Sequence, residues 1–137
     1  MERTISSVTV PGDLPRAVER AVASGELPAA DRDRTLRFLE AEIASVAARG
    51  WFAESGVEVL NEAPLLGPEG QEVRPDRVVL GPDGSAAVID YKFGQPEKKY
   101  LDQVRGYMEL YRSLGHHPVT GTLWYIRENG ADEFVEV

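Results

Sequence analysis

Residues 72–92, EVRPDRVVLGPDGSAAVIDYK, form the stretch of sequence that decides the fold. Aliphatic and β-branched residues dominate 72–80 and again 85–92, and this composition predicts two strands. Between them, residues 81–84 read Gly-Pro-Asp-Gly, which is a strong turn signal. The stretch therefore predicts a β-hairpin at the centre of the protein.

Three charged side chains converge at one end of this predicted hairpin. Asp76 and Asp90 lie on neighbouring strands, and Lys92 shares a face with Asp90 because residues i and i+2 of a strand point the same way. Two carboxylates and an ammonium are suited to holding Mg²⁺ and to orienting a water that attacks a phosphate. Because the apolar run 86–89 precedes Asp90, its carboxylate needs a cation or hydrogen bonds, so a structural Asp90–Lys92 ion pair is the alternative.

Composition limits the kind of protein. The chain has 137 residues, 42% of them hydrophobic and 28% charged, which is the size and make-up of one globular domain. It has no cysteine, which excludes disulfides and zinc–thiolate sites and fits a cytoplasmic location. No apolar run is long enough for a membrane span, so we expect no membrane partner.

The formal net charge of −8 argues against a stand-alone nucleic-acid-binding protein, which usually presents a basic surface. Metal-binding carboxylates contribute to this count, and a bound cation would reverse the local field. A basic partner domain could also provide the binding to DNA.

The periodicity of apolar residues predicts an α/β fold, with a mixed sheet flanked by helices. Helices are expected over 13–27, 31–49 and 97–114, and strands over 56–66, 72–80, 85–92, 119–127 and 134–137.

Three further residues are candidates for the same site. Glu62, within the first predicted strand, is expected to be a third acidic ligand, a partner of Lys92, or a plain surface glutamate. Gln103 and Tyr107 lie four positions apart and share a helical face, from which they can contact a phosphate or a base. The alternative is that Tyr107 belongs to the core and Gln103 to the surface.

Four basic residues flank these positions. They are expected either to contact a phosphate backbone or to be solvated: Arg74, Arg77, Lys98 and Lys99.

Taken together, the residues from Glu62 to Ile126 resemble a PD-(D/E)-x-K nuclease of the RecB type, as found at the C-terminus of UvrD-like (AddA-like) helicase–nucleases. The resemblance implies a restriction-endonuclease-like fold. It implies that Asp76, Asp90 and Lys92 are catalytic. It also implies that the metal, Mg²⁺ or Mn²⁺, is held by Asp76, Asp90, the Tyr91 carbonyl and Glu62. Finally, it assigns Gln103 and Tyr107 to DNA contacts.

One feature of the RecB type is absent from the sequence. The family carries a metal-binding histidine on a helix before the core, whereas no histidine precedes His116 here. Residues 1–8 resemble the tail of that helix, so we expect the histidine either to lie upstream of residue 1 or to be replaced, with Glu2 as the candidate.

The resemblance implies one nuclease domain over residues 1–137, with an N-terminal helical part over 1–50 and the nuclease core over 56–137. No helicase motif is present, so we expect the chain to be a fragment of a longer helicase–nuclease acting in DNA double-strand-break repair and recombination. The expected partners are DNA and a helicase domain of the same or another chain. Two alternatives stay open: an inactive nuclease-fold scaffold or DNA-binding module, and an unrelated α/β domain with a structural salt bridge.

Overall fold

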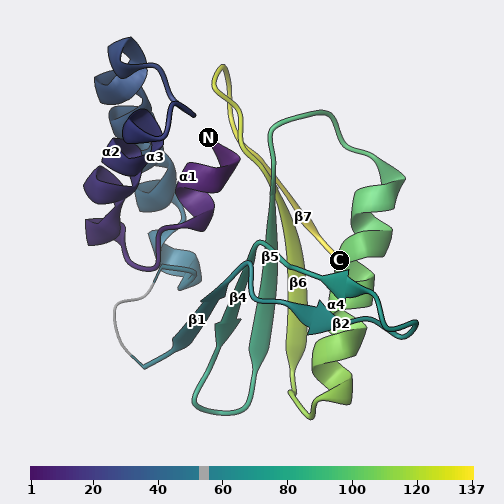
Figure 1. Cartoon of the computed structure of the whole chain (residues 1–137). Coiled ribbons are helices and arrows are strands. Elements are labelled where there is room, and N and C mark those ends of the chain that lie inside the picture. The colour runs from purple at the N-terminus through teal and green to yellow at the C-terminus, as the bar shows by residue number, and fades with distance from the viewer. Residues whose placement is uncertain (53–55) are drawn as a thin grey trace. The chain divides into compact units, whose positions relative to one another are not determined.

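The computed structural model describes residues 1–52 and 56–137, and for Glu2 only the backbone. The chain divides into two compact units, Met1–Ser55 and Gly56–Val137 (Figure 1). Within the described residues, no helix combines the length and the apolar character that crossing a bilayer requires.

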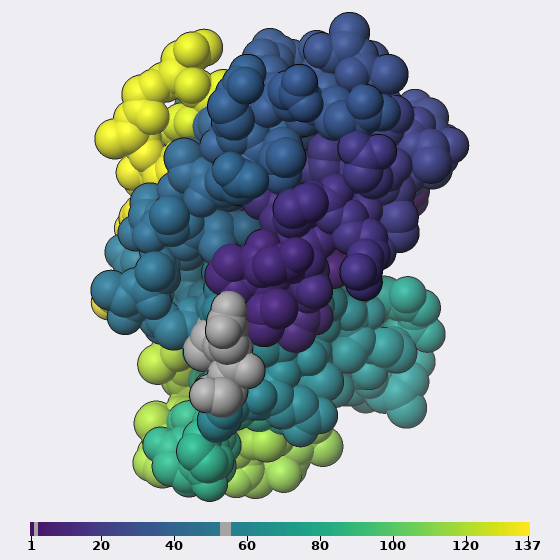
Figure 2. All heavy atoms as spheres, turned by 90° about the vertical axis from the view of Figure 1, so that its left-hand side faces the viewer, coloured from purple at the N-terminus to yellow at the C-terminus, as the bar shows by residue number. Residues whose placement is uncertain are grey.

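The first unit is helical (Figure 1), and Figure 2 shows its atoms in purple to blue. The amphipathic helix α2 buries Leu14, Ala17, Val18 and Ala21, which recur at the i, i+3, i+4 and i+7 spacing of one helical face. Both helices expected here are shorter than predicted: the first ends at Ala23, and a 3₁₀ turn takes the last residues of the second. The α-helices are α1 (Glu2–Ser6), α2 (Leu14–Ala23) and α3 (Arg32–Ser45), and the 3₁₀ turns are η1 (Pro11–Asp13), η2 (Ala29–Asp31) and η3 (Ala47–Arg49).

The second unit is built on a five-stranded mixed sheet in the order β1-β4-β5-β6-β7 (Figure 1). Neighbouring strands are antiparallel except for β5 and β6, which run parallel and are connected through α4. This architecture confirms the predicted α/β fold with a mixed, restriction-endonuclease-like sheet. The strands are β1 (Glu58–Asn61), β4 (Arg77–Leu80), β5 (Ala86–Lys92), β6 (Val119–Tyr125) and β7 (Glu133–Glu136), and helix α4 spans Lys98–Ser113.

A small second sheet interrupts the first two predicted strands. The strands expected over 56–66 and 72–80 are each split, and their inner ends pair as the hairpin β2 (Leu65–Leu66) and β3 (Glu72–Val73). The chain leaves β1 at Glu62, which has a left-handed backbone (φ 50°), and it rejoins the main sheet after Pro75. Proline lacks the N–H that a strand ladder needs, so the break before β4 falls where pairing would fail.

Helix α4 covers one face of the sheet. Its buried side chains Val104, Tyr107 and Met108 contact Val88 of β5 and Leu123 of β6 in one apolar core.

The helix approaches the sheet most closely at Gly121 of β6. A Cβ at that position would meet the Met108 thioether and would lie 2.8 Å from Val104. This packing fixes the height of α4 above β5, and with it the position of Gln103.

Candidate active site

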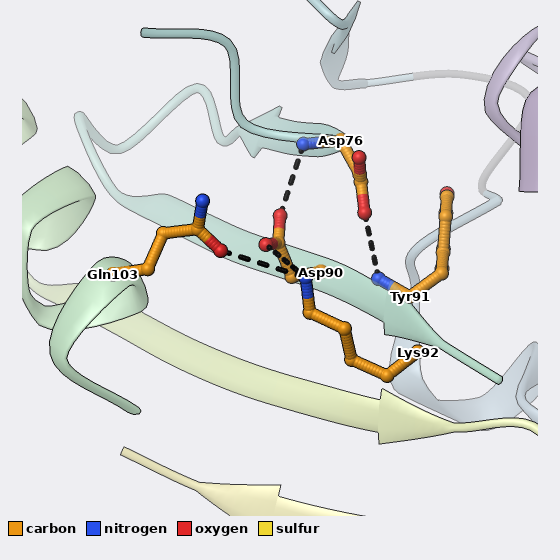
Figure 3. Close-up of polar contacts among 5 residues, drawn as sticks. All are labelled: Asp76, Asp90, Tyr91, Lys92 and Gln103. Carbon is orange, nitrogen blue, oxygen red and sulfur yellow. Dashed lines mark hydrogen bonds and ion pairs between the residues drawn. The ribbon is translucent and has the colours of Figure 1, made fainter. Parts of the chain in front are cut away.

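Strand pairing places Asp76 directly opposite Asp90. Arg77 pairs with Ile89 in the β4–β5 ladder, so the next pair along is Asp76 with Asp90. The Asp76 N–H donates to Asp90 Oδ1 at 3.0 Å, and the Tyr91 N–H donates to Asp76 Oδ2 at 2.9 Å (Figure 3). Each carboxylate therefore accepts a backbone hydrogen bond from the other strand, and the hairpin brings the two acids together as predicted.

Lys92 completes this group from the same face of β5. Its Nζ lies 3.6 Å from Asp90 Oδ2 and donates to Gln103 Oε1 on α4 at 3.5 Å (Figure 3). The Asp90 side chain is 4% exposed and that of Lys92 is 18% exposed, so the pair lies in a largely dry environment. In this arrangement Gln103 is linked to the catalytic candidates through Lys92.

Tyr100, at the start of α4, is also part of the site, although its residue type alone did not single it out. The Lys92 ammonium lies over its ring, 4.4 Å from the ring centroid, and Lys99 lies 5.4 Å from the same centroid. A cation over an aromatic face is attracted by the ring quadrupole. Tyr100, Asp90 and Gln103 thus hold the Lys92 ammonium from three sides, and the signal available in the sequence was an aromatic residue one helical turn before Gln103.

Burial dominates the electrostatics of the acid pair. Desolvation raises the pKa of Asp90 above its ordinary value, and the Asp76 N–H and the Lys92 ammonium only partly oppose this effect. Burial also raises the pKa of Tyr107 to about 12, with Asp90 and Asp76 adding to the effect. Tyr107 therefore remains a neutral hydroxyl at physiological pH, within electrostatic reach of both carboxylates.

Glu62 takes a different position from the other acids. It lies just beyond β1, where its backbone N–H donates to the Asp76 carbonyl at 3.1 Å, and its side chain is exposed. In the described part of the chain, no group of three or more His, Cys, Asp or Glu side chains is close enough to hold a metal ion. The structure thus unites Asp76 with Asp90 and does not add Glu62 to them as a third ligand. The side chain of Glu2, the candidate replacement for the family histidine, lies outside the described residues.

The four flanking basic residues divide into two groups. Arg74, Lys98 and Lys99 are exposed and pair with nearby acids, in keeping with solvated positions. Arg77 is fully buried, so the expectation that it contacts phosphate or solvent is wrong. Its guanidinium donates to Asn61 Oδ1 at 2.9 Å, because strand alternation turns Arg77 to the sheet face opposite Asp76.

The donor set fits a hard divalent cation in part. Two carboxylates from adjacent strands offer hard oxygens, the ligand type that Mg²⁺ and Mn²⁺ prefer. One of them, Asp90, is buried with a single cation at 3.6 Å, which leaves its charge incompletely compensated. The Tyr91 backbone carbonyl, between Asp90 and Lys92 in the chain, is the further ligand that the resemblance implies, and water and a phosphate oxygen would complete the shell.

The fold and site together define a restriction-endonuclease-like α/β domain with an Asp…Asp-x-Lys centre. A family model described as "PD-(D/E)XK nuclease superfamily" matches residues 3–136, and the chain belongs to this superfamily. No curated protein matches the chain.

One similar solved structure is titled "Crystal structure of SSO0001". It shares 19% sequence identity with a TM-score of 0.36, and the match covers 97% of this chain and 66% of that one. The chain therefore spans just under two thirds of that protein's length.

Proposed function

We propose that the chain is the nuclease domain of a metal-dependent deoxyribonuclease that hydrolyses phosphodiester bonds. The observation that carries the proposal is the interlocked pair of Asp76 and Asp90, with Lys92 3.6 Å from the second acid. Membership of a nuclease superfamily supports the same conclusion.

Asp76, Asp90 and the Tyr91 carbonyl would hold Mg²⁺ or Mn²⁺. When bound, such an ion polarises the phosphoryl group and lowers the pKa of a bound water. Lys92 would orient the attacking water and stabilise the negative charge that develops on the phosphorus oxygens. Its ammonium is already held by Asp90, Gln103 and Tyr100, so little reorganisation is needed. Gln103 and Tyr107 would position the strand, Tyr107 as a neutral hydrogen-bond donor.

The wider context is part of the same proposal. The net charge of −8 weakens the binding of this domain to a polyanion, so a helicase domain of the same or a partner chain would raise the local concentration of DNA at the site. Such a helicase–nuclease would act in the cytoplasm in double-strand-break repair and recombination. The complete reading frame would test this context, because helicase motifs should flank the nuclease domain.

The direct test compares cleavage of linear DNA by the wild type and by Asp90→Ala and Lys92→Ala, in Mn²⁺ and in EDTA. Each variant should lose at least about a hundredfold in rate, the scale of removing one transition-state donor. Lys98→Ala, which removes an exposed lysine paired with Asp102, is the matched control and should cleave normally. Cleavage by both site variants at the wild-type rate would overturn the mechanism.

A second candidate is an inactive nuclease-fold scaffold or DNA-binding module. It is favoured by the lack of a three-ligand acidic group among the described residues, and within this candidate the net charge of −8 favours the scaffold. A calorimetric titration with Mn²⁺ separates the two: absence of binding at millimolar metal would support the scaffold, whereas binding abolished by Asp90→Ala would support the nuclease.

A further inference from the structure

An open groove lies between the β2–β3 hairpin and helix α4. Its volume is about 740 Å³, within the range of roughly 300–1,000 Å³ that is typical of small-molecule sites. Its lining is chiefly apolar and includes Pro68, Gln71 and Val73 from the hairpin and Gln103, Tyr107 and Leu110 from the helix.

The groove is continuous with the candidate active site. Gln103 lines the groove and also accepts from Lys92, and Tyr107 lines it while lying in the field of Asp90 and Asp76. The hairpin that forms the other wall begins and ends next to the site. The chain leaves the main sheet at Glu62 and returns to it at Asp76, and a backbone hydrogen bond joins these two residues. A ligand in the groove would therefore adjoin any phosphate held at Asp90 and Lys92.

The charges around the groove favour an uncharged ligand. Asp102 and Glu109 line it, and each has a cationic partner: Asp102 with Lys98 at 3.7 Å and Arg105 at 3.5 Å, and Glu109 with Arg112. The walls are therefore close to neutral and offer no unpaired cation for a phosphate among these residues. A flat, largely apolar group with polar edges suits apolar walls flanked by amide side chains, and a nucleobase has this character.

We propose that this groove binds one nucleoside of the substrate strand, next to the phosphate at the Asp90–Lys92 centre. The base would lie between hairpin and helix, and the amides of Gln71 and Gln103 would meet its polar edge. The inference rests on the proposed function in taking DNA as the substrate, and it adds a subsite that reads a neutral part of the strand.

Gly106 allows a clean test. It lines the groove from mid-helix, and a Cβ built there meets no heavy atom within 4 Å. Replacement by alanine or leucine favours the helix, since both exceed glycine in helix propensity. Gly106→Leu fills the groove, whereas Gly106→Ala leaves most of it open and serves as the matched control. Thermal melts should show that both variants are at least as stable as the wild type.

Binding is measured by fluorescence anisotropy of a short labelled single strand in EDTA, and cleavage is measured separately in Mn²⁺. Gly106→Leu should weaken binding about tenfold, or ~1.4 kcal/mol, while Gly106→Ala stays within about twofold. A strand carrying 5-iodouracil should photo-crosslink to residues 67–73 or 102–113.

The two assays separate the two proposals. If the wild type never cleaves DNA but Gly106→Leu still weakens strand binding, the groove proposal is supported and the nuclease proposal is overturned. Unchanged binding and cleavage by the leucine variant would overturn the groove and leave the nuclease standing. A wild type that binds no strand would overturn the groove, and so would crosslinks confined to other segments. If leucine instead abolishes self-association without affecting DNA, the occupant is a second copy of the chain and the proposal is wrong.

Discussion

Asp90→Asn is expected to stabilise the metal-free protein while abolishing cleavage. The wild-type side chain is 4% exposed, and burial raises the pKa of its carboxyl despite the Asp76 N–H and Lys92. An amide of nearly the same shape keeps an acceptor for the Asp76 N–H and removes the buried charge. Lys92 loses its counterion but keeps Gln103 and the Tyr100 ring. The expected gain is about 0.5–2 kcal/mol, typical of a stabilising substitution, or roughly 2–8 °C in Tm for a domain of this size.

The pH dependence of this gain has a definite sign. The folded-state pKa of Asp90 lies above the unfolded value of 3.8, so folding favours the protonated acid. The ionised carboxylate therefore destabilises the fold at pH values above its folded pKa. This penalty disappears as the pH falls through the folded pKa towards 3.8. The difference in stability between Asn variant and wild type should be widest near neutral pH and should close in acid.

Metal should reverse the order of stability. A ligand that binds only the folded state stabilises it by RT ln(1 + [L]/Kd), which is about 2.7 kcal/mol at a hundredfold excess over Kd and exceeds the gain expected for Asp90→Asn. Mn²⁺ should therefore raise the Tm of the wild type and leave that of Asp90→Asn nearly unchanged. The assay is a set of thermal melts in EDTA and in Mn²⁺, at neutral and acidic pH. An Asn variant less stable than the wild type in EDTA at neutral pH would refute the reasoning.

Asp83→Asn is the control of opposite sign. Asp83 is exposed in the turn between β4 and β5, and hydrogen bonds from Ser85 lower its pKa. Its carboxylate contributes stability above its unfolded pKa and loses it in acid. Asp83→Asn should therefore slightly lower the Tm at neutral pH, and Mn²⁺ should raise the Tm of this variant as it raises that of the wild type, because the Asp76–Asp90 pair is intact.

Substitutions at three further positions test the packing and hydrogen bonds around the site. Tyr100→Leu removes the ring beside Lys92, so it should lower the cleavage rate about tenfold and shift the pH–rate profile. Tyr100→Phe keeps the ring and should restore the wild-type rate and profile. If the leucine and phenylalanine variants behave alike, the ring does not position Lys92. Gly121→Ala should cost about 1–3 kcal/mol of stability by overpacking α4 against the sheet, measured by urea unfolding, whereas wild-type stability would show that the helix yields freely. Asp132→Ala removes the acceptor of the Trp124 indole N–H (2.8 Å) and should cost about 1–3 kcal/mol in the same assay; an unchanged midpoint would contradict this.

Local patterns were sufficient to predict the centre of the site. The period of two along β5 determined that Asp90 and Lys92 share a face, and the turn signal at 81–84 fixed the register that sets Asp76 opposite Asp90. Both inferences depend only on chain geometry over a few residues, so they were available without knowledge of the tertiary structure.

The β2–β3 hairpin was not predicted. Leu65 and Leu66 read as the continuation of the preceding strand, and Glu72 and Val73 as the beginning of the next. The left-handed backbone of Glu62 separates β1 from β2. Glutamate rarely adopts this conformation, so the residue type does not predict the break. The break before β4 is predictable from Pro75, because proline cannot donate a hydrogen bond to a strand ladder.

The sequence also could not predict which side chains from distant elements contact each other. Arg77 looked like a surface cation beside an acid, but alternation along β4 directs it to a buried face, where it meets Asn61 of β1. Tyr100 was not among the candidate residues, but its ring lies beside the Lys92 ammonium in the folded chain. Both outcomes depend on which elements become neighbours, and only the assembled sheet and helix determine that.

The two ends of the β2–β3 hairpin segment, Glu62 and Asp76, lie side by side, so this segment can be changed independently of the main sheet. Because Glu62 N–H and Asp76 C=O are joined at 3.1 Å, the chain departs from and returns to adjacent points of the main sheet. Lengthening or exchanging residues 63–75 would leave the pairing of β1, β4 and β5 in register, and the entropy of closing a longer loop grows only slowly with its length. The chemistry and one wall of the adjoining groove are thus encoded in separable segments, so that grafting a different hairpin offers a route to alter strand preference while leaving the acid pair intact.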